Sequence, residues 1–270
     1  MKIPSLLASL TLLCLHALPA PASAQTPPPA QSEPLPSAES LFGKYFRAIG
    51  VSSDTAPIQS LRIKGKGSES NGADAKESPP FEASLAAAPR RSVFSMSGLY
   101  QSGWDGKTVW EREDKEPKVL TGKEAHLVTV GFSNLIFPDP AHWKLLGTAR
   151  CVGTQEVEGT PCYTVECVRE TFPPIRLYFS TESGLLMRKD WACPHHDAGD
   201  KDSHSFFQIF TDYKEVNGIA YPHTFAMGAL NANGTAEAAS TIFTIESLEI
   251  NPTLPENTFA LPPGLPPTTP

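Results

Sequence analysis

The sequence lacks the short motifs that usually mark an enzyme. It contains no Gly-x-Ser-x-Gly, no His-Glu-x-x-His, no phosphate-binding loop and no dinucleotide fingerprint. Its carboxylates are scattered along expected strands, so no pair suited to glycoside hydrolysis can be nominated. We therefore expect a non-enzymatic protein that needs no cofactor.

Positive charge and long apolar runs are also scarce. There are 22 lysines and arginines against 29 aspartates and glutamates, a formal net charge of −7, which becomes about −8 once a leader containing Lys2 is removed. This balance argues against nucleic acid as a partner and against binding to anionic bilayers by charge. After the first residues no run is long enough to cross a bilayer, so we expect no transmembrane segment in the mature chain.

The N-terminus has the organisation of an export signal. A basic residue precedes an apolar run from Leu6 to Leu15, and Ala22-Ser23-Ala24 has the Ala-x-Ala form of a cleavage site. We predict a signal peptide over residues 1–24 and a mature protein in the periplasm or outside the cell. A lipoprotein signal at Cys14 is an alternative, but Leu13 stands where the lipoprotein peptidase needs a small residue.

Four of the five cysteines remain after such cleavage, and an even number in an exported chain suggests disulfides. A hairpin turn at Glu158-Gly159 that contains a one-residue bulge can bring Cys151 opposite Cys167. We predict a disulfide between these two, with Cys162 and Cys193 as a second pair. Free buried thiols remain the alternative, because the sequence does not fix the register.

Both ends of the mature chain are rich in proline. Residues 25–36 show no apolar periodicity and are expected to form an extended, solvated tether, and residues 262–270 form a tail of the same kind. Between them, residues 37–261 are expected to form a single β domain.

Two helices are expected. The first begins at Ser37 as N-cap and ends at Gly50, with apolar residues at three- and four-residue spacing. The second begins with a capping box at Thr121-Gly122-Lys123-Glu124 and ends before Pro138. Its apolar residues include Leu127, Val128, Val130, Phe132, Leu135 and Ile136.

The rest of the chain alternates strand-like segments with tight turns, and Ser68 to Pro80 is expected to be a loop. The clearest hairpin is closed by Asn217-Gly218, because both residues tolerate a positive φ. The expected strands span about 58–67, 81–87, 91–96, 99–104, 107–113, 145–157, 160–169, 175–180, 185–191, 204–216, 219–227 and 236–250. Roughly a dozen strands against two helices predict a mainly β (α+β) fold with one large antiparallel sheet that curves round the helices.

The turn and strand at Asp105-Gly106-Lys107-Thr108-Val109-Trp110, which follow Pro89-Arg90-Arg91, resemble those of the LolA/LolB-like periplasmic lipoprotein carriers and outer-membrane lipoprotein-sorting proteins. The segments from Asp212 to Pro222 and from Asn251 to Phe259 are similar to the last strands and terminal segment of that family. The likeness runs from Ser37 to Pro262.

This resemblance implies an incomplete β-barrel, closed by helices, whose apolar cavity carries acyl chains through water. Arg91 lies in the segment that corresponds to the family's proline-then-arginine strand and is a candidate for a latch or for contact with a lipid head group; a solvated strand arginine is the alternative and the more common case. The other residues expected to bind lipid are Trp104, Trp110, Leu127, Phe132, Leu135, Phe179, Phe207 and Ile209. The alternative is that the aromatic ones are core or sheet-packing residues, which is the more common role of such side chains.

One dense group of possible metal ligands runs from Cys193 to His204 and includes His195, His196 and Asp197. Its spacing fits no established zinc pattern, so we interpret it as a soluble turn and predict no metal site. A metal-dependent hydrolase that uses His195 remains a remote alternative.

The sequence thus predicts an exported, non-enzymatic carrier or binding protein for lipid or lipoprotein acyl chains, with a possible protein partner in the cell envelope. The alternative from another class is a structural or protein-interaction module on the same scaffold, with its cavity filled by side chains.

Overall fold

A computed structural model describes residues 34–52, 54–69, 77–113, 116–122, 124–125, 137–169, 172–193, 204–231, 233–236 and 238–265. The chain divides into the units Met1–Pro34 and Leu35–Pro270, and the second is treated below. The expected signal peptide lies outside the described residues, as does most of the proline-rich tether and of the proline-rich tail. These assignments stay predictions.

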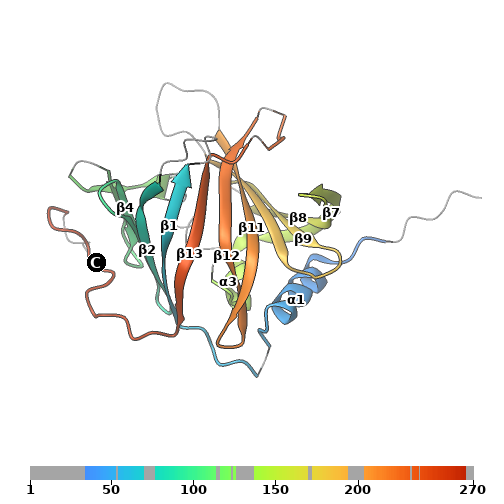
Figure 1. The fold of residues 1–270 in the computed structure, drawn as a ribbon, viewed down its shortest axis with the longest axis horizontal. Coiled ribbons are helices and arrows are strands. Elements are labelled where there is room, and N and C mark those ends of the chain that lie inside the picture. The colour runs from blue at the N-terminus through green and yellow to red at the C-terminus, as the bar shows by residue number, and fades with distance from the viewer. Residues whose placement is uncertain are drawn as a thin grey trace, which may run out of the picture. The chain divides into compact units, whose positions relative to one another are not determined.

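In the described part of the chain, one open antiparallel sheet of thirteen strands dominates the fold (Figure 1). Strands β1 to β6 follow one another across one half and β7 to β13 across the other, and the two halves join because β1 pairs with β13. The sheet is curved and does not close, which confirms the incomplete barrel. The strands are β1 Ser60–Glu69, β2 Glu77–Ala87, β3 Arg90–Met96, β4 Tyr100–Trp104, β5 Val109–Arg112, β6 Lys118–Leu120, β7 Thr148–Val157, β8 Thr160–Arg169, β9 Phe172–Ser180, β10 Leu186–Cys193, β11 His204–Val216, β12 Ile219–Leu230 and β13 Thr241–Ile250.

The first expected helix is confirmed as α1, Ala38–Ala48. Ser37 caps it, since its side chain accepts a hydrogen bond from the Ser40 amide at 3.1 Å, and Gly50 follows it with a φ of 83°. The predicted Asn217-Gly218 turn is also confirmed, with φ values of 53° and 81°.

The second expected helix falls largely outside the described residues, and so do Leu127, Phe132 and Leu135. Helical backbone is described at Gly122 and at residues 124–125. Beyond this stretch the chain forms a one-turn helix, α3 (Pro140–Trp143), and a 3-10 turn, η2 (Lys144–Leu146), where a strand from Leu145 was expected. Proline is favoured in the first turn of a helix, where its missing amide costs nothing, and β7 begins only after Gly147.

The expected loop from Ser68 to Pro80 was wrong at both ends. β1 continues to Glu69 and β2 already begins at Glu77, with Pro80 opposite Lys66 beside a register irregularity. Proline is tolerated where a ladder is interrupted, because no amide is needed there. Strand β6 was not predicted, since three residues carry too little pattern.

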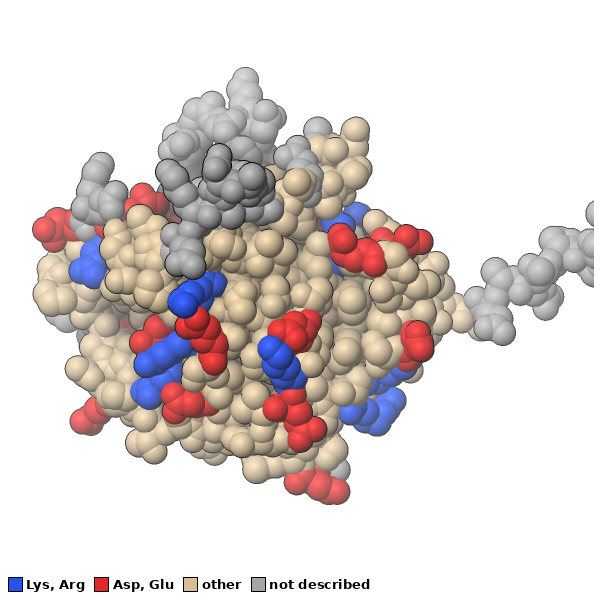
Figure 2. Space-filling view, viewed as in Figure 1, with Lys and Arg blue, Asp and Glu red and all other residues tan. Residues whose placement is uncertain are grey.

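The two faces of the sheet differ. We call the face that packs against α1 and α3 the inner face and the opposite one the outer face. Leu61 and Ile63 of β1 are buried on the inner face, whereas Arg62 between them lies on the outer face. There its Nε lies 3.7 Å from Oε1 of Glu82, and its Nη1 lies 3.8 Å from Oε1 of Glu249. Figure 2 shows acidic and basic side chains beside one another, as these outer-face ion pairs require.

The predicted Cys151–Cys167 disulfide is wrong. The extra residue of the bulge lies on β7, between Cys151 and Gly153, so Cys151 pairs with Val165 and Cys167 pairs with Ala149. The prediction needed the bulge on β8. Cys151, Cys162 and Cys167 are free, and burial raises the pKa of the Cys162 thiol to about 11 and that of Cys167 to about 12. A Cys162–Cys193 bridge is therefore not formed either.

Candidate functional site

Aromatic side chains fill the inner face beneath α1. Phe42 and Tyr45 of the helix each lie 5.8 Å from the ring of Phe179 on β9, measured between ring centroids. Trp143 of α3 lies 5.2 Å from Phe42 and 5.0 Å from Tyr45. Since Phe179 is fully buried, this half of the inner face is packed with side chains, which also fix α1 on the sheet.

A second aromatic cluster, Phe81, Phe94, Phe225 and Phe243, covers the inner face of β2, β3, β12 and β13. The ring centroids of Phe225 and Phe243 are 5.0 Å apart, and those of Phe81 and Phe243 are 5.5 Å apart. Each ring is at most 7% exposed. The four rings therefore form one contiguous, buried aromatic cluster on this half of the inner face.

Gly65 of β1 makes room for this cluster. A Cβ atom at this position would lie 2.7 Å from the ring of Phe81 and 2.2 Å from the carbonyl oxygen of Thr244. The Phe81 ring can therefore lie directly on the backbone of β1.

One lysine is buried within the inner face. Lys189 of β10 is fully buried, and its Nζ lies 4.4 Å from the centroid of the Trp191 ring. In the ladder it pairs with Gln208 of β11 and Leu177 of β9. Burial lowers the pKa of Lys189 well below its usual value, because the apolar surroundings disfavour the charged form.

Three tyrosines, Tyr45, Tyr213 and Tyr221, place uncharged hydroxyl groups near α1. Tyr45 and Tyr213 lie close enough to share a hydrogen bond, and the Tyr213 hydroxyl donates to the carbonyl oxygen of Leu186 at 2.7 Å. Burial raises the pKa of Tyr45, Tyr213 and Tyr221 above the usual tyrosine value. The three phenols therefore stay protonated, and none is set up as a base.

The residues that the sequence suggested for lipid binding divide between the two faces. The register places Trp104 and Phe179 on the inner face. It places Arg91, Trp110, Phe207 and Ile209 on the outer face, where Trp110 lies on Gly103 and Phe207 lies on Gly228. A role in lipid binding stays a prediction for all of them.

Sequence reasoning missed the aromatic cluster of Phe81, Phe94, Phe225 and Phe243, and it missed Lys189. The alternation of faces along each strand could have found them, because Phe81 and Leu85 share one face of β2. What sequence could not supply was the pairing of β1 with β13, which brings β2 and β3 near β12 and β13.

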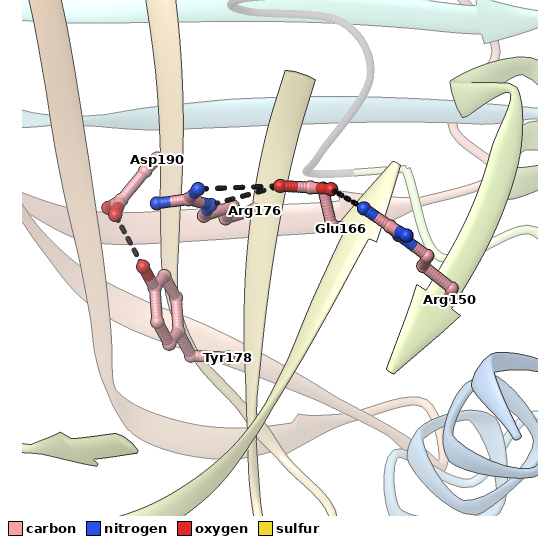
Figure 3. A network of polar contacts seen from close by, with 5 residues as sticks. All are labelled: Arg150, Glu166, Arg176, Tyr178 and Asp190. Carbon is pink, nitrogen blue, oxygen red and sulfur yellow. Dashed lines mark hydrogen bonds and ion pairs between the residues drawn. The ribbon is translucent and has the colours of Figure 1, made fainter. Parts of the chain in front are cut away.

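The outer face of β7 to β10 carries a polar network (Figure 3). The register aligns Arg150, Glu166, Arg176 and Asp190 on four adjacent strands. Glu166 accepts from Arg150 at 2.9 Å and from Arg176 at 3.4 Å. Asp190 accepts from the Tyr178 hydroxyl at 2.7 Å.

Paired charges in this network lower the pKa of Glu166, chiefly through its hydrogen bond to Arg150. Burial, followed by the nearby Asp190, raises the pKa of Tyr178. A carboxylate that is neutralised by arginine and a phenol that keeps its proton are poor proton-transfer groups. We interpret the network as structural.

The possible metal ligands lie almost entirely outside the described residues. Cys193 and His204 are paired through the backbones of β10 and β11, and residues 194–203 between them are not described. Within the described ranges, no group of three or more His, Cys, Asp or Glu side chains could hold a metal ion. Nor is any described helix long and apolar enough to cross a membrane.

The described chain thus forms an unclosed antiparallel sheet whose apolar inner face is partly covered by α1 and α3. No protein-family model matches the chain, and no curated protein matches it in sequence. Solved structures do match. A LolA superfamily protein from Nitrosomonas europaea superposes with a TM-score of 0.52 over 84% of this chain and 99% of its own, at 10% identity.

Two further structures agree with this assignment of the fold. A DUF1329 family protein from Desulfovibrio piger matches with a TM-score of 0.52 at 13% identity, over 82% of this chain and 96% of its own. An outer membrane lipoprotein-sorting protein domain from Vibrio parahaemolyticus matches with a TM-score of 0.51 at 10% identity, over 83% and 94%. At these identities the likeness concerns the fold.

Proposed function

We propose that this protein is an exported, non-enzymatic carrier that binds the acyl chains of a lipid or lipoprotein against its inner face. The observation that carries the proposal is the aromatic cluster of Phe81, Phe94, Phe225 and Phe243 on an unclosed sheet. A lipoprotein-sorting domain has the same fold. Exposing an acyl chain to water costs about 0.8 kcal/mol per methylene, so a carrier needs such a surface.

The aromatic cluster is the better candidate for acyl contact than the surface beneath α1. There, Phe42 and Tyr45 of α1 and Trp143 of α3 already cover Phe179, at centroid distances between 5.0 and 5.8 Å. This cover by helix side chains favours the alternative function, an interaction module with a filled interior, for that half of the sheet.

Lipid extraction and fatty-acid uptake test the carrier function. Organic extraction of the purified protein followed by mass spectrometry should give co-purifying lipid, and the delipidated protein should take up a fluorescent long-chain fatty acid. An empty extract together with no uptake would reject the carrier and leave the interaction module.

A matched pair of variants tests which face of the sheet binds the acyl chain. Phe81 on the inner face and Phe207 on the outer face are both at most 3% exposed, so Phe81→Leu and Phe207→Leu should cost similar stability. Only Phe81→Leu should weaken fatty-acid binding, by about threefold to tenfold, because part of one aromatic contact is lost. Equal weakening would show that the acyl chain does not select the inner face.

A further inference from the structure

A separate cavity of about 290 Å³ lies on the outer face, between the C-terminal segment, residues 251–265, and the ends of β1 and β2. Its lining includes Ser60, Ala86, Arg91, Leu254, Pro255 and Phe259. In Figure 1 this segment leaves β13 and passes toward the β2–β4 side of the sheet. One wall of the cavity is therefore formed by the chain's own terminal segment.

The C-terminal segment is firmly anchored where it begins. The side-chain oxygen of Asn251 accepts from the Gln59 amide at 2.6 Å, and its side-chain nitrogen donates to the carbonyl oxygen of Pro57 at 3.1 Å. The Ser60 hydroxyl donates to the Pro252 carbonyl oxygen at 2.9 Å. These bonds hold the cavity wall in place without any ligand.

Arg91 supplies the charge of this cavity. Its guanidinium carbon lies 4.7 Å from the centroid of the Phe259 ring. Its Nε is buried, and within the described part of the chain no atom accepts a hydrogen bond from it. A buried donor that lacks an acceptor destabilises the folded protein, and an acceptor supplied by a ligand removes that cost. Arg62 on the same face has carboxylates at 3.7 and 3.8 Å, whereas Arg91 has no such ion pair among the described residues.

We propose that the outer-face cavity binds a small monocarboxylic acid, with its carboxylate on Arg91 and its apolar body on Ala86, Leu254 and Pro255. A guanidinium forms two parallel hydrogen bonds with a carboxylate, and such a pair gives Nε an acceptor. The volume is close to the lower end of about 300–1,000 Å³ for small-molecule sites. Glu256 also lines the cavity, and its charge disfavours a dianion such as phosphate.

Calorimetric titration of the purified protein with hexanoate tests this proposal, with hexylamine and inorganic phosphate as matched probes. Hexanoate should bind, and the other two should bind at least about tenfold more weakly. Arg91→Gln should weaken hexanoate binding about tenfold or more, and Arg91→Lys should recover only part, since lysine lacks the guanidinium fork. Arg62→Gln, which changes an arginine on the same face, should leave binding unchanged.

Glu256→Gln provides an independent variant that does not disturb Arg91. It should strengthen hexanoate binding, because a like charge near the carboxylate is removed. Hexylamine binding as well as hexanoate, or unchanged hexanoate binding in a folded Arg91→Gln protein, would overturn the proposal. Because the cavity lies on the outer face, these results are separate from those for acyl chains on the inner face.

Discussion

At the residue scale, the two faces of the sheet differ in whether they stabilise a charged side chain. On the outer face, Glu166 lies between Arg150 and Arg176, and its charged form is favoured. On the inner face, Lys189 is fully buried, and its charged form is disfavoured. The sheet therefore separates a paired-charge surface from an interior of low polarity, which is what a surface that binds apolar groups requires.

The lowered pKa of Glu166 predicts a pH-dependent contribution to stability. A carboxylate whose pKa is lower in the folded state stabilises the fold above its unfolded pKa, and this stabilisation is lost as the pH falls through the folded pKa. Glu166→Gln should therefore lower the free energy of unfolding by about 0.5–1 kcal/mol at pH 7, since both arginines are exposed. The difference from the unmodified protein should shrink below about pH 4.

Urea denaturation of both proteins at pH 7 and at about pH 3 measures this difference. Glu156→Gln is the matched control, because Glu156 lies on the adjacent strand β7 without an ion pair in the described part of the chain. A difference that is as large in acid as at neutral pH would show that the Glu166 charge is not its source.

At the scale of single elements, glycine has opposite consequences in α1 and in β1. Gly43 lies within the helix, where a Cβ atom would lie no closer than 3.4 Å to the end of the Arg47 side chain. Gly65 lies under the Phe81 ring, where no Cβ fits. The effect of a substitution on stability should therefore depend on helix propensity at Gly43 and on aromatic packing at Gly65.

We expect Gly43→Ala to raise the free energy of unfolding by about 0.5–1 kcal/mol, because alanine loses less backbone entropy in a helix. Gly65→Ala should lower it by about 1–3 kcal/mol, because the Phe81 ring and the backbone of β13 must move. Thermal denaturation followed by circular dichroism measures both. A neutral Gly65→Ala would show that Phe81 is not packed on the β1 backbone.

Elements with strong local signals were predicted well. Ser37 and Gly50 set the two ends of α1, and Asn217-Gly218 fixed the β11–β12 hairpin, because each signal acts within a few residues. The loop predicted over the polar stretch from Ser68 to Pro80 was wrong at both ends, since pairing with the neighbouring strand extends β1 to Glu69 and starts β2 at Glu77. The predicted Cys151–Cys167 disulfide was wrong for the same reason. Which of the two strands carries the bulge depends on the rest of the sheet and not on the hairpin residues alone.

At the scale of the whole molecule, the sheet depends on the pairing of β1 with β13, which runs from Leu61 opposite Ile250 to Glu69 opposite Thr241. Phe81 thereby meets Phe225 and Phe243 across β1. The aromatic cluster exists only when this pairing is formed, so acyl binding and global folding should be linked.

A long-chain fatty acid should accordingly raise the thermal midpoint of the protein. A ligand at about one hundred times its dissociation constant stabilises the folded state by about 2.7 kcal/mol. For a chain of this size we expect a rise of roughly 5–10 °C, measured with dodecanoate by scanning calorimetry. The rise should persist in Arg91→Gln, which separates the inner face from the outer-face cavity. No rise at saturating dodecanoate would contradict binding to the inner face.

The sequence by itself determined the class of the fold, its first helix and its clearest hairpin, because these follow from periodicity and turn chemistry within short stretches. Only the tertiary structure decided which side chains face inward, that three cysteines are free thiols, and that Arg91 lies on Phe259 in an outer-face cavity. A one-residue change of register moves every side chain of a strand to the opposite face, and register is set between strands.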